Sequence, residues 1–111
     1  MRQFFNVKIS YLPGRIVMTM AGELDLTTCS QAAPVIASLA IAGQDLTLDM
    51  TRVTFMDASG LGMLMRLRQW VVAGGGVVEL RGVQPQVWRV LELTGTDAQF
   101  RETVLHALPG A

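Results

Sequence analysis

The sequence predicts an α/β domain with a mixed β-sheet, and the order of its elements is the main reason. Two short β-like runs come first, and then three helical patterns alternate with two further strands. Strands separated by helices of this length form crossover connections, which make the strands parallel. The two opening runs are joined by a tight turn, which makes them antiparallel. The chain length of 111 residues fits a single domain covering residues 1–111.

The opening hairpin is predicted from two apolar runs on either side of a turn signal. Val7, Ile9 and Tyr11 alternate with polar residues, which is typical of a half-buried strand. Pro13-Gly14 favours a turn, and the apolar run 16–20 supplies the second strand.

The first helical pattern covers residues 28–42, after an expected loop at residues 22–26. Thr27 and Thr28 are suitable helix caps. Pro34 is out of place here, because a proline inside a helix removes a hydrogen bond and costs roughly 3 kcal/mol. The helix is therefore expected either to begin near Pro34 or to be kinked there.

The rest of the chain alternates strand and helix. A strand at 46–50 is followed by residues 51–56, and the next apolar helical pattern runs from Leu61 to Val72. A strand at 77–80 precedes a third helix from Pro85, which Gly95 ends. For the tail 96–111 the sequence allows either a short strand near Phe100 followed by a helix, or one helix alone.

Composition and charge exclude several classes of function. Nine basic and nine acidic residues give a net charge of zero with no basic stripe, so nucleic acid is not an expected partner. No apolar stretch reaches the ~20 residues that span a bilayer, so we expect no membrane insertion. The N-terminus lacks the apolar run of a signal peptide. Cys29 is the single cysteine, which suits a reducing cytoplasm.

Searches for catalytic patterns also give negative results. His106 is the single histidine and lies in the tail, and no second cysteine accompanies Cys29. Gly74-Gly75-Gly76 lacks the Lys-Ser/Thr of a phosphate-binding loop. Lys8, the single lysine, lies in the first strand, whereas an acidic phosphoacceptor pocket needs a late lysine. We therefore predict no enzyme activity, catalytic residue, cofactor or metal.

Two polar segments remain as candidate sites. Asp57-Ala58-Ser59-Gly60 lies where a strand feeds a helix, so Asp57 or Ser59 can cap that helix, or its free N–H groups can receive an anion. The second segment is Gly22-Glu23-Leu24-Asp25. Two interpretations fit it: an acidic loop that contacts a partner or a cation, or a solvated turn before a helix cap.

Three segments in order resemble the STAS family, which includes bacterial anti-sigma factor antagonists. They are Gly22-Glu23-Leu24-Asp25, then Phe55-Met56-Asp57-Ala58-Ser59-Gly60-Leu61-Gly62, and finally Val87-Trp88-Arg89-Val90-Leu91-Glu92-Leu93-Thr94-Gly95. The resemblance covers about residues 6–100. Residues 101–111 are then a C-terminal tail, for which a helix is one alternative. It implies a mixed sheet with helices packed mainly on one face.

The resemblance also implies a mechanism. In the antagonist class, a serine at the start of the central helix is phosphorylated by a partner anti-sigma factor kinase. The unphosphorylated protein binds that kinase and releases the sigma factor, and the added phosphate disrupts binding. The implied partner is an anti-sigma factor of the serine kinase type. The implied protein is cytoplasmic, and either a monomer or a weak homodimer.

The sequence departs from the family motif at the acceptor position, where Ala58 replaces the usual serine and has no hydroxyl. Ser59 is one residue further on, and on a helix this rotates the side chain by about 100°. We expect a constitutively unphosphorylated antagonist. The alternatives are an antagonist that uses Ser59 as a displaced acceptor and a STAS scaffold outside sigma-factor control.

The predicted partner-binding residues follow from the resemblance and the helix start. They are Asp25, Asp57, Ala58, Ser59, Gly60, Leu61 and Gly62. The alternative function is a STAS subunit or scaffold of a larger assembly, such as a lipid-transport ATPase complex. A nucleotide-binding domain is a third hypothesis, for which the sequence offers no convincing phosphate cradle.

Overall fold

A computed structural model describes residues 5–100 and confirms the predicted α/β fold with a mixed sheet. The elements in chain order are β1 (Phe5–Leu12), β2 (Arg15–Leu24), α1 (Leu26–Ala37), β3 (Asp45–Met56), α2 (Ala58–Ala73), β4 (Val78–Arg81) and α3 (Pro85–Thr94). The sheet order is β1-β2-β3-β4. The β1–β2 pair is antiparallel, and the β2–β3 and β3–β4 pairs are parallel.

The hairpin has the two-residue turn that the sequence predicts. Leu12 pairs with Arg15, so Pro13 and Gly14 alone form the connection. Gly14 has φ +72°, a left-handed conformation that glycine adopts without steric cost.

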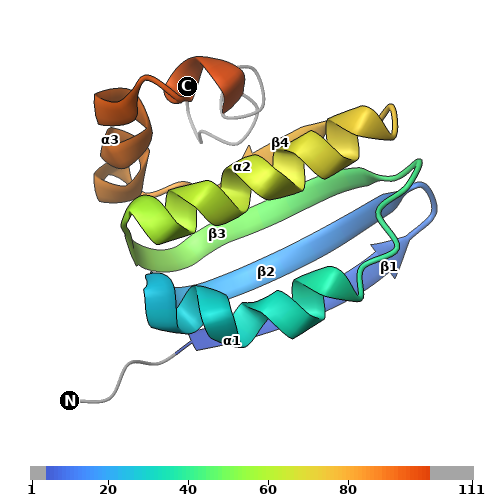
Figure 1. The fold of residues 1–111 in the computed structure, drawn as a ribbon, viewed down its shortest axis with the longest axis horizontal. Coiled ribbons are helices and arrows are strands. Elements are labelled where there is room, and N and C mark those ends of the chain that lie inside the picture. Colours follow the sequence, from blue (N-terminus) through green and yellow to red (C-terminus); the bar gives the residue numbers. More distant parts are fainter. Residues whose placement is uncertain (1–4, 101–111) are drawn as a thin grey trace.

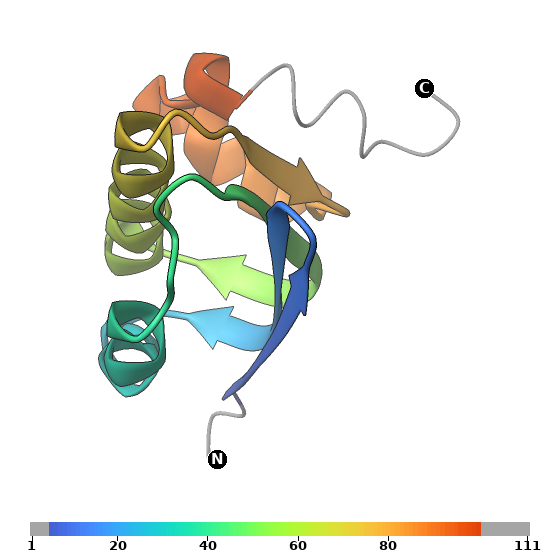
Figure 2. The ribbon, with the colours of Figure 1, turned by 90° about the vertical axis from the view of Figure 1, so that its right-hand side faces the viewer.

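Helices α1 and α2 lie side by side on one face of the sheet, as predicted from the resemblance (Figures 1 and 2). The strand residues beneath them are fully buried and aliphatic or sulfur-containing: Ile16, Met18, Met20, Leu46, Leu48 and Met50. Alternate residues of the same strands point to the opposite face. There Arg15 lies 3.7 Å from Asp45 and 3.6 Å from Glu79, so that face is polar.

Helix α3 occupies a position beside the second half of β3. Strand β4 pairs only with residues 46–49 of β3, so on this side the later part of β3 has no neighbouring strand, while β2 pairs with it on the other side. Side-chain amides from the start of α3 occupy this edge: Gln84 Nε2 donates to Thr51 O (2.7 Å) and Gln86 Nε2 to Thr54 O (3.3 Å).

The expected loop at residues 22–26 is wrong. Strand β2 continues to Leu24, because Glu23 and Leu24 pair with Phe55 and Met56 in β3. Helix α1 then begins at Leu26, and its cap is Asp25 rather than Thr27 or Thr28. For the same reason β3 extends past the predicted 46–50 to Met56.

Pro34 lies inside α1, in its last turn, so the helix neither begins there nor continues to residue 42. The N–H that a proline lacks would have bonded the carbonyl of Ser30, an exposed residue whose carbonyl water can satisfy. The position near the helix end limits the cost to that one bond.

For the tail, the structure contradicts the alternative in which a short strand lies near Phe100. Residues 97–100 are helical, so the strand near Phe100 is wrong, and Phe100 is buried at 1% exposure. The expected tail helix over 101–111, and His106 within it, lie outside the described residues. Over residues 5–100, no helix is both long and apolar enough to cross a membrane.

Candidate functional site

The candidate site lies where the carboxyl ends of β2 and β3 meet the N-termini of α1 and α2. Asp57 N donates to Leu24 O (3.2 Å), which ties the start of α2 to the end of the neighbouring strand. The two sequence segments singled out as candidates, around Asp25 and around Asp57, therefore share one edge of the sheet. Such edges of α/β sheets commonly carry binding sites.

Asp57 is the N-cap of α2. Its Oδ1 accepts hydrogen bonds from Ser59 N (2.9 Å) and Gly60 N (3.2 Å), which have no partner within the helix. The capping interpretation of Asp57 is thus confirmed, and Ser59 has no capping role. Because the Asp57 carboxylate already occupies these N–H groups, the helix start does not present them to an anion.

Asp25 caps α1 in the same way, within a capping box. Asp25 Oδ1 accepts from Thr28 N (3.0 Å), and Thr28 Oγ1 accepts from Asp25 N (2.9 Å). Thr28 is buried at 1% exposure and its hydroxyl also donates to Glu23 O. The acidic segment is therefore a strand end and a helix cap. Among residues 5–100 no group of acidic, His and Cys side chains is arranged to hold a metal ion.

Gly60 and Gly62 have different structural roles. A Cβ on Gly60 would lie 2.6 Å from Leu24 O and 2.7 Å from Met56 Cγ, so only glycine lets α2 pack this closely on the strand ends. A Cβ on Gly62 would meet only Arg66 Nη1, at an ordinary 3.5 Å. Gly60 is buried and positions the helix, whereas Gly62 leaves space on its surface.

A groove of about 320 Å³ opens between the first turns of α1 and α2. It is lined by Leu26, Cys29, Ser30, Ala33, Ala58, Ser59, Gly62 and Arg66. Ala58 is exposed and Ser59 is half-buried. Leu26 is 69% exposed at the rim, so its side chain is accessible to a partner there.

The structure brings the seven predicted partner-binding residues to this one edge, but they do not all reach the surface. Gly60 is buried and Leu61 packs against the core. Sequence reasoning missed Leu26 and Arg66. The signal for Arg66 was its spacing, since it follows Gly62 by four residues and Ser59 by seven, which places all three on one helix face.

Cys29 lies in the groove without the properties of a nucleophile. Burial raises the pKa of its thiol, and the negative charges of Asp57 and Asp25 raise it further, while Arg66 opposes them. The thiol is therefore held protonated near neutral pH, and a thiol reacts far more slowly than a thiolate.

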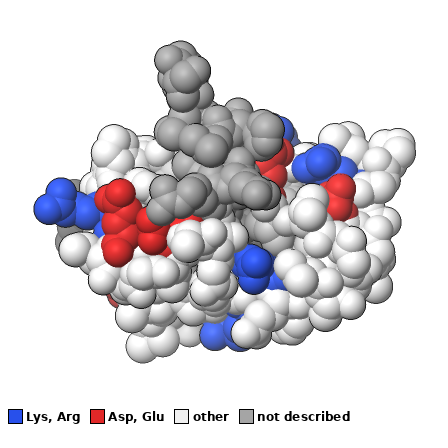
Figure 3. All heavy atoms as spheres, turned by 90° about the horizontal axis from the view of Figure 1, so that it is seen from above, with Lys and Arg blue, Asp and Glu red and all other residues white. Residues whose placement is uncertain are grey.

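The face of the molecule that is seen from above in Figure 1 is mixed in charge. Figure 3 shows small groups of Lys and Arg side chains beside Asp and Glu side chains on this face, among mostly uncharged atoms. A continuous basic stripe of the kind that tracks a phosphate backbone is missing from the described atoms of that face.

The chain belongs to the STAS domain family, whose model matches residues 6–107. The resemblance inferred from the three sequence segments is thereby confirmed.

The chain is similar to individual proteins of more than one kind. The chain is 28% identical over 90 residues to the anti-sigma-B factor antagonist of Bacillus subtilis (strain 168), covering 81% of this chain and 83% of that protein. The solved anti-sigma factor antagonist SpoIIAA in its unphosphorylated form has a similar fold (TM-score 0.72, 23% identity, covering 86% of this chain and 85% of that one). A sulfate transporter family protein from Wolinella succinogenes is also similar in fold (TM-score 0.69, 21% identity, 81% and 75% covered).

Proposed function

We propose that the chain is an anti-sigma factor antagonist, a binding module that docks on an anti-sigma factor of the serine kinase type and so releases a sigma factor. The observation that carries the proposal is the surface at the N-termini of α1 and α2. There two capped helix starts present Leu26, Ala58 and Ser59 around one groove. The similarity to the Bacillus antagonist supports the role. In this role the protein acts without catalysis, in the cytoplasm, as a monomer or weak homodimer.

The regulation we propose is constitutive binding. Position 58 is exposed, where a kinase could reach it, but alanine has no hydroxyl to phosphorylate. Ser59 is half-buried, lines the groove toward α1, and its backbone N–H is held by Asp57. These features favour an antagonist without the usual switch over one that uses Ser59 as a displaced acceptor.

Docking is tested by calorimetry against anti-sigma factors of the serine kinase type from the same genome. Leu26→Arg places a charge on the proposed surface without touching either cap, and we expect it to abolish measurable binding. Leu93→Arg is the matched control, because Leu93 is 77% exposed on α3 and does not line the groove. If no such kinase binds the wild-type protein, or if both variants weaken binding equally, the proposed docking surface is wrong.

Constitutive binding is tested by intact mass after incubation with the bound kinase and ATP. We expect no added phosphate on the wild type and a gain of one phosphate on the Ala58→Ser variant. A phosphate on the wild type that Ser59→Ala removes would establish Ser59 as the acceptor instead.

A second function is a STAS subunit of a larger membrane-associated assembly, which the fold similarity to a sulfate transporter family protein favours. Co-purification of the tagged chain with a membrane ATPase or transporter would support this function. A stable pair with a kinase alone would oppose it.

A further inference from the structure

The groove at the helix starts is the first part of a longer channel between α1 and α2. A second hollow of about 260 Å³ shares Cys29, Ala33 and Arg66 with the first. A third, of about 620 Å³, shares Ile36, Ala37 and Trp70 with the second. Neighbouring hollows share lining residues, so the three lie in a row and together make up the groove along the seam of the two helices.

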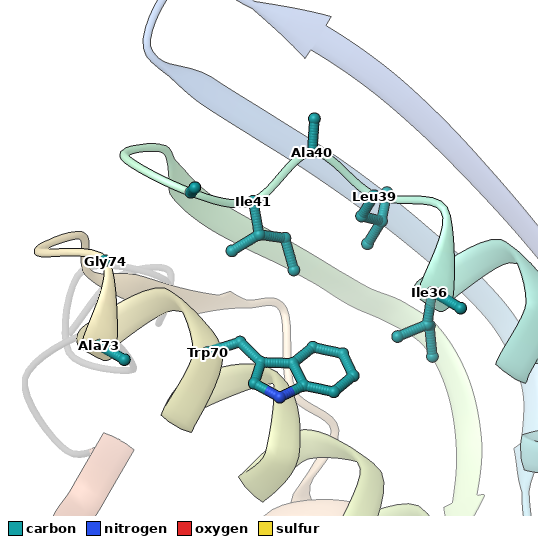
Figure 4. A pocket seen from close by; sticks show the side chains of 9 residues that line it. Ile36, Leu39, Ala40, Ile41, Trp70, Ala73 and Gly74 are labelled. Carbon is teal, nitrogen blue, oxygen red and sulfur yellow. The ribbon is translucent and has the colours of Figure 1, made fainter.

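Three of the side chains that line the groove from α1 are small, and one large side chain lies open on α2. Cys29, Ala33 and Ala37 line it from α1 at intervals of four residues. Figure 4 shows the Trp70 indole reaching from α2 toward Ile36 and Ile41 across the far part of the groove. Trp70 is 47% exposed, so much of this large apolar side chain remains uncovered.

Arg66 is the single charged residue among those that line the three hollows. It lies between the part near Ser59 and the part near Trp70, and is shared by the first two hollows. Its guanidinium forms no ion pair with any residue in the range 5–100. The groove is thus lined mainly by apolar side chains and carries one positive charge, while the carboxylates of Asp25 and Asp57 act on its first part, at Cys29.

We propose that this groove receives an amphipathic helix of a protein partner, whose apolar stripe covers Trp70 and whose carboxylate pairs with Arg66. Helices recognised in this way contact the groove at positions i, i+3, i+4 and i+7. The proposal deepens the proposed function, on which it rests, since the helix belongs to the docked partner. It extends the contact surface from the helix starts to the opposite ends of α1 and α2.

The dimensions suit a helix rather than a small ligand. Along α2 the lining residues run from Ala58 to Gly74, which corresponds to roughly 24 Å at the rise of an α-helix, or about 16 residues of a partner helix. The groove is open to solvent along its length, since Ala33, Ala37 and Ala73 are all exposed. An open apolar channel with a charge partway along matches the side of a helix in shape and in charge.

The inference is tested with a probe peptide, so that the anti-sigma factor is not needed. The probe is a 16-residue (about four turns) helical peptide with a leucine stripe and glutamates flanking it. Its controls are a peptide with lysine at the glutamate positions and a peptide of scrambled order. Trp70 fluorescence reports binding, in a Trp88→Phe background that removes the other tryptophan.

We expect the glutamate peptide to bind at micromolar concentration and to shift the Trp70 emission. Arg66→Glu should weaken it by about tenfold or more, which corresponds to the loss of one interfacial charge pair, and should favour the lysine peptide. Ala33→Phe, which fills the groove, should abolish binding. Arg68→Glu and Gln69→Phe are the matched controls on α2, because neither residue lines the groove, and should leave binding unchanged.

Several outcomes would overturn the inference. These are no binding of the glutamate peptide, equal binding by Arg66→Glu and wild type, binding of oleate in place of the peptide, or self-association that Ala33→Phe removes. If the kinase binds the wild type but the peptide does not, and Ala33→Phe leaves kinase binding intact, this inference fails alone. If the peptide binds but no kinase does, the proposed function fails and the groove remains.

Discussion

Gly60 and Gly62 offer a sharp test of how α2 is positioned, because the same substitution should have opposite effects two residues apart. In Gly60→Ala the new methyl would lie 2.6 Å from Leu24 O and 2.8 Å from Leu24 Cβ, well inside van der Waals contact. The first of these atoms is backbone, so α2 or the end of β2 must shift. Overpacking of this kind costs typically about 1–3 kcal/mol.

In Gly62→Ala the new methyl would meet only Arg66 Nη1 at 3.5 Å, at a helical position. There alanine is better than glycine by roughly 0.5–1 kcal/mol, because it loses less backbone entropy on folding. The two variants should therefore differ in unfolding free energy by about 1.5–4 kcal/mol, in opposite directions from the wild type.

Urea denaturation followed by circular dichroism measures both variants against the wild type. A Gly60→Ala protein as stable as the wild type would show that α2 does not depend on this close approach. Equal destabilisation of both variants would mean that helix-wide effects, and not the contact with Leu24, explain the glycine at position 60.

Three further predictions concern the cap of α2, the edge of β3 and the thiol of Cys29. Asp57→Ala should lower the unfolding free energy by about 0.5–2 kcal/mol through loss of the α2 cap, with Asp57→Asn close to the wild type in the same urea titration, and equal losses would contradict the capping role. Gln84→Ala should lower the unfolding free energy by about 1 kcal/mol in the same urea titration, because the Thr51 carbonyl loses its side-chain donor. Unchanged stability would refute a contribution of this bond. Cys29 should react with a maleimide more slowly in the folded protein than in urea, because its raised pKa reduces the thiolate fraction, and equal rates would refute that explanation.

The fold was largely predictable because its signals are local. Pro13-Gly14, the apolar alternation in β1 and the helical period after Leu61 each depend on neighbours in sequence. The errors arose where distant residues decide the structure. Glu23 and Leu24 look like loop residues by composition, and they are strand residues because Phe55 and Met56 pair with them. This pairing between residues far apart in the sequence cannot be predicted from local propensity.

The candidate site was predictable to the extent that it depends on chemistry at a helix start. The cap at Asp57 follows from its residue type and the helical pattern after it. The Arg66 contribution to the groove could not be inferred with the same ease, because a groove requires knowing which face of α2 turns toward α1. From the sequence alone, the small residues of α1 look like ordinary helix formers. Their contribution to the groove becomes visible only when the positions of the two helices are known.

The amides of Gln84 and Gln86 also affect how the sheet can meet other chains. An exposed strand edge is a template for pairing with a strand of another molecule. On the β3 side, β4 and then the start of α3 occupy that edge, so an incoming strand finds the carbonyls of Thr51 and Thr54 already bonded. Within the part of the chain that the structure describes, the outer side of β4 offers a free edge of four residues, whereas the opposite edge, β1, offers eight and carries the exposed Lys8, whose charge opposes pairing with a neighbouring sheet. The short β4 thus shapes association between molecules as well as the fold of one.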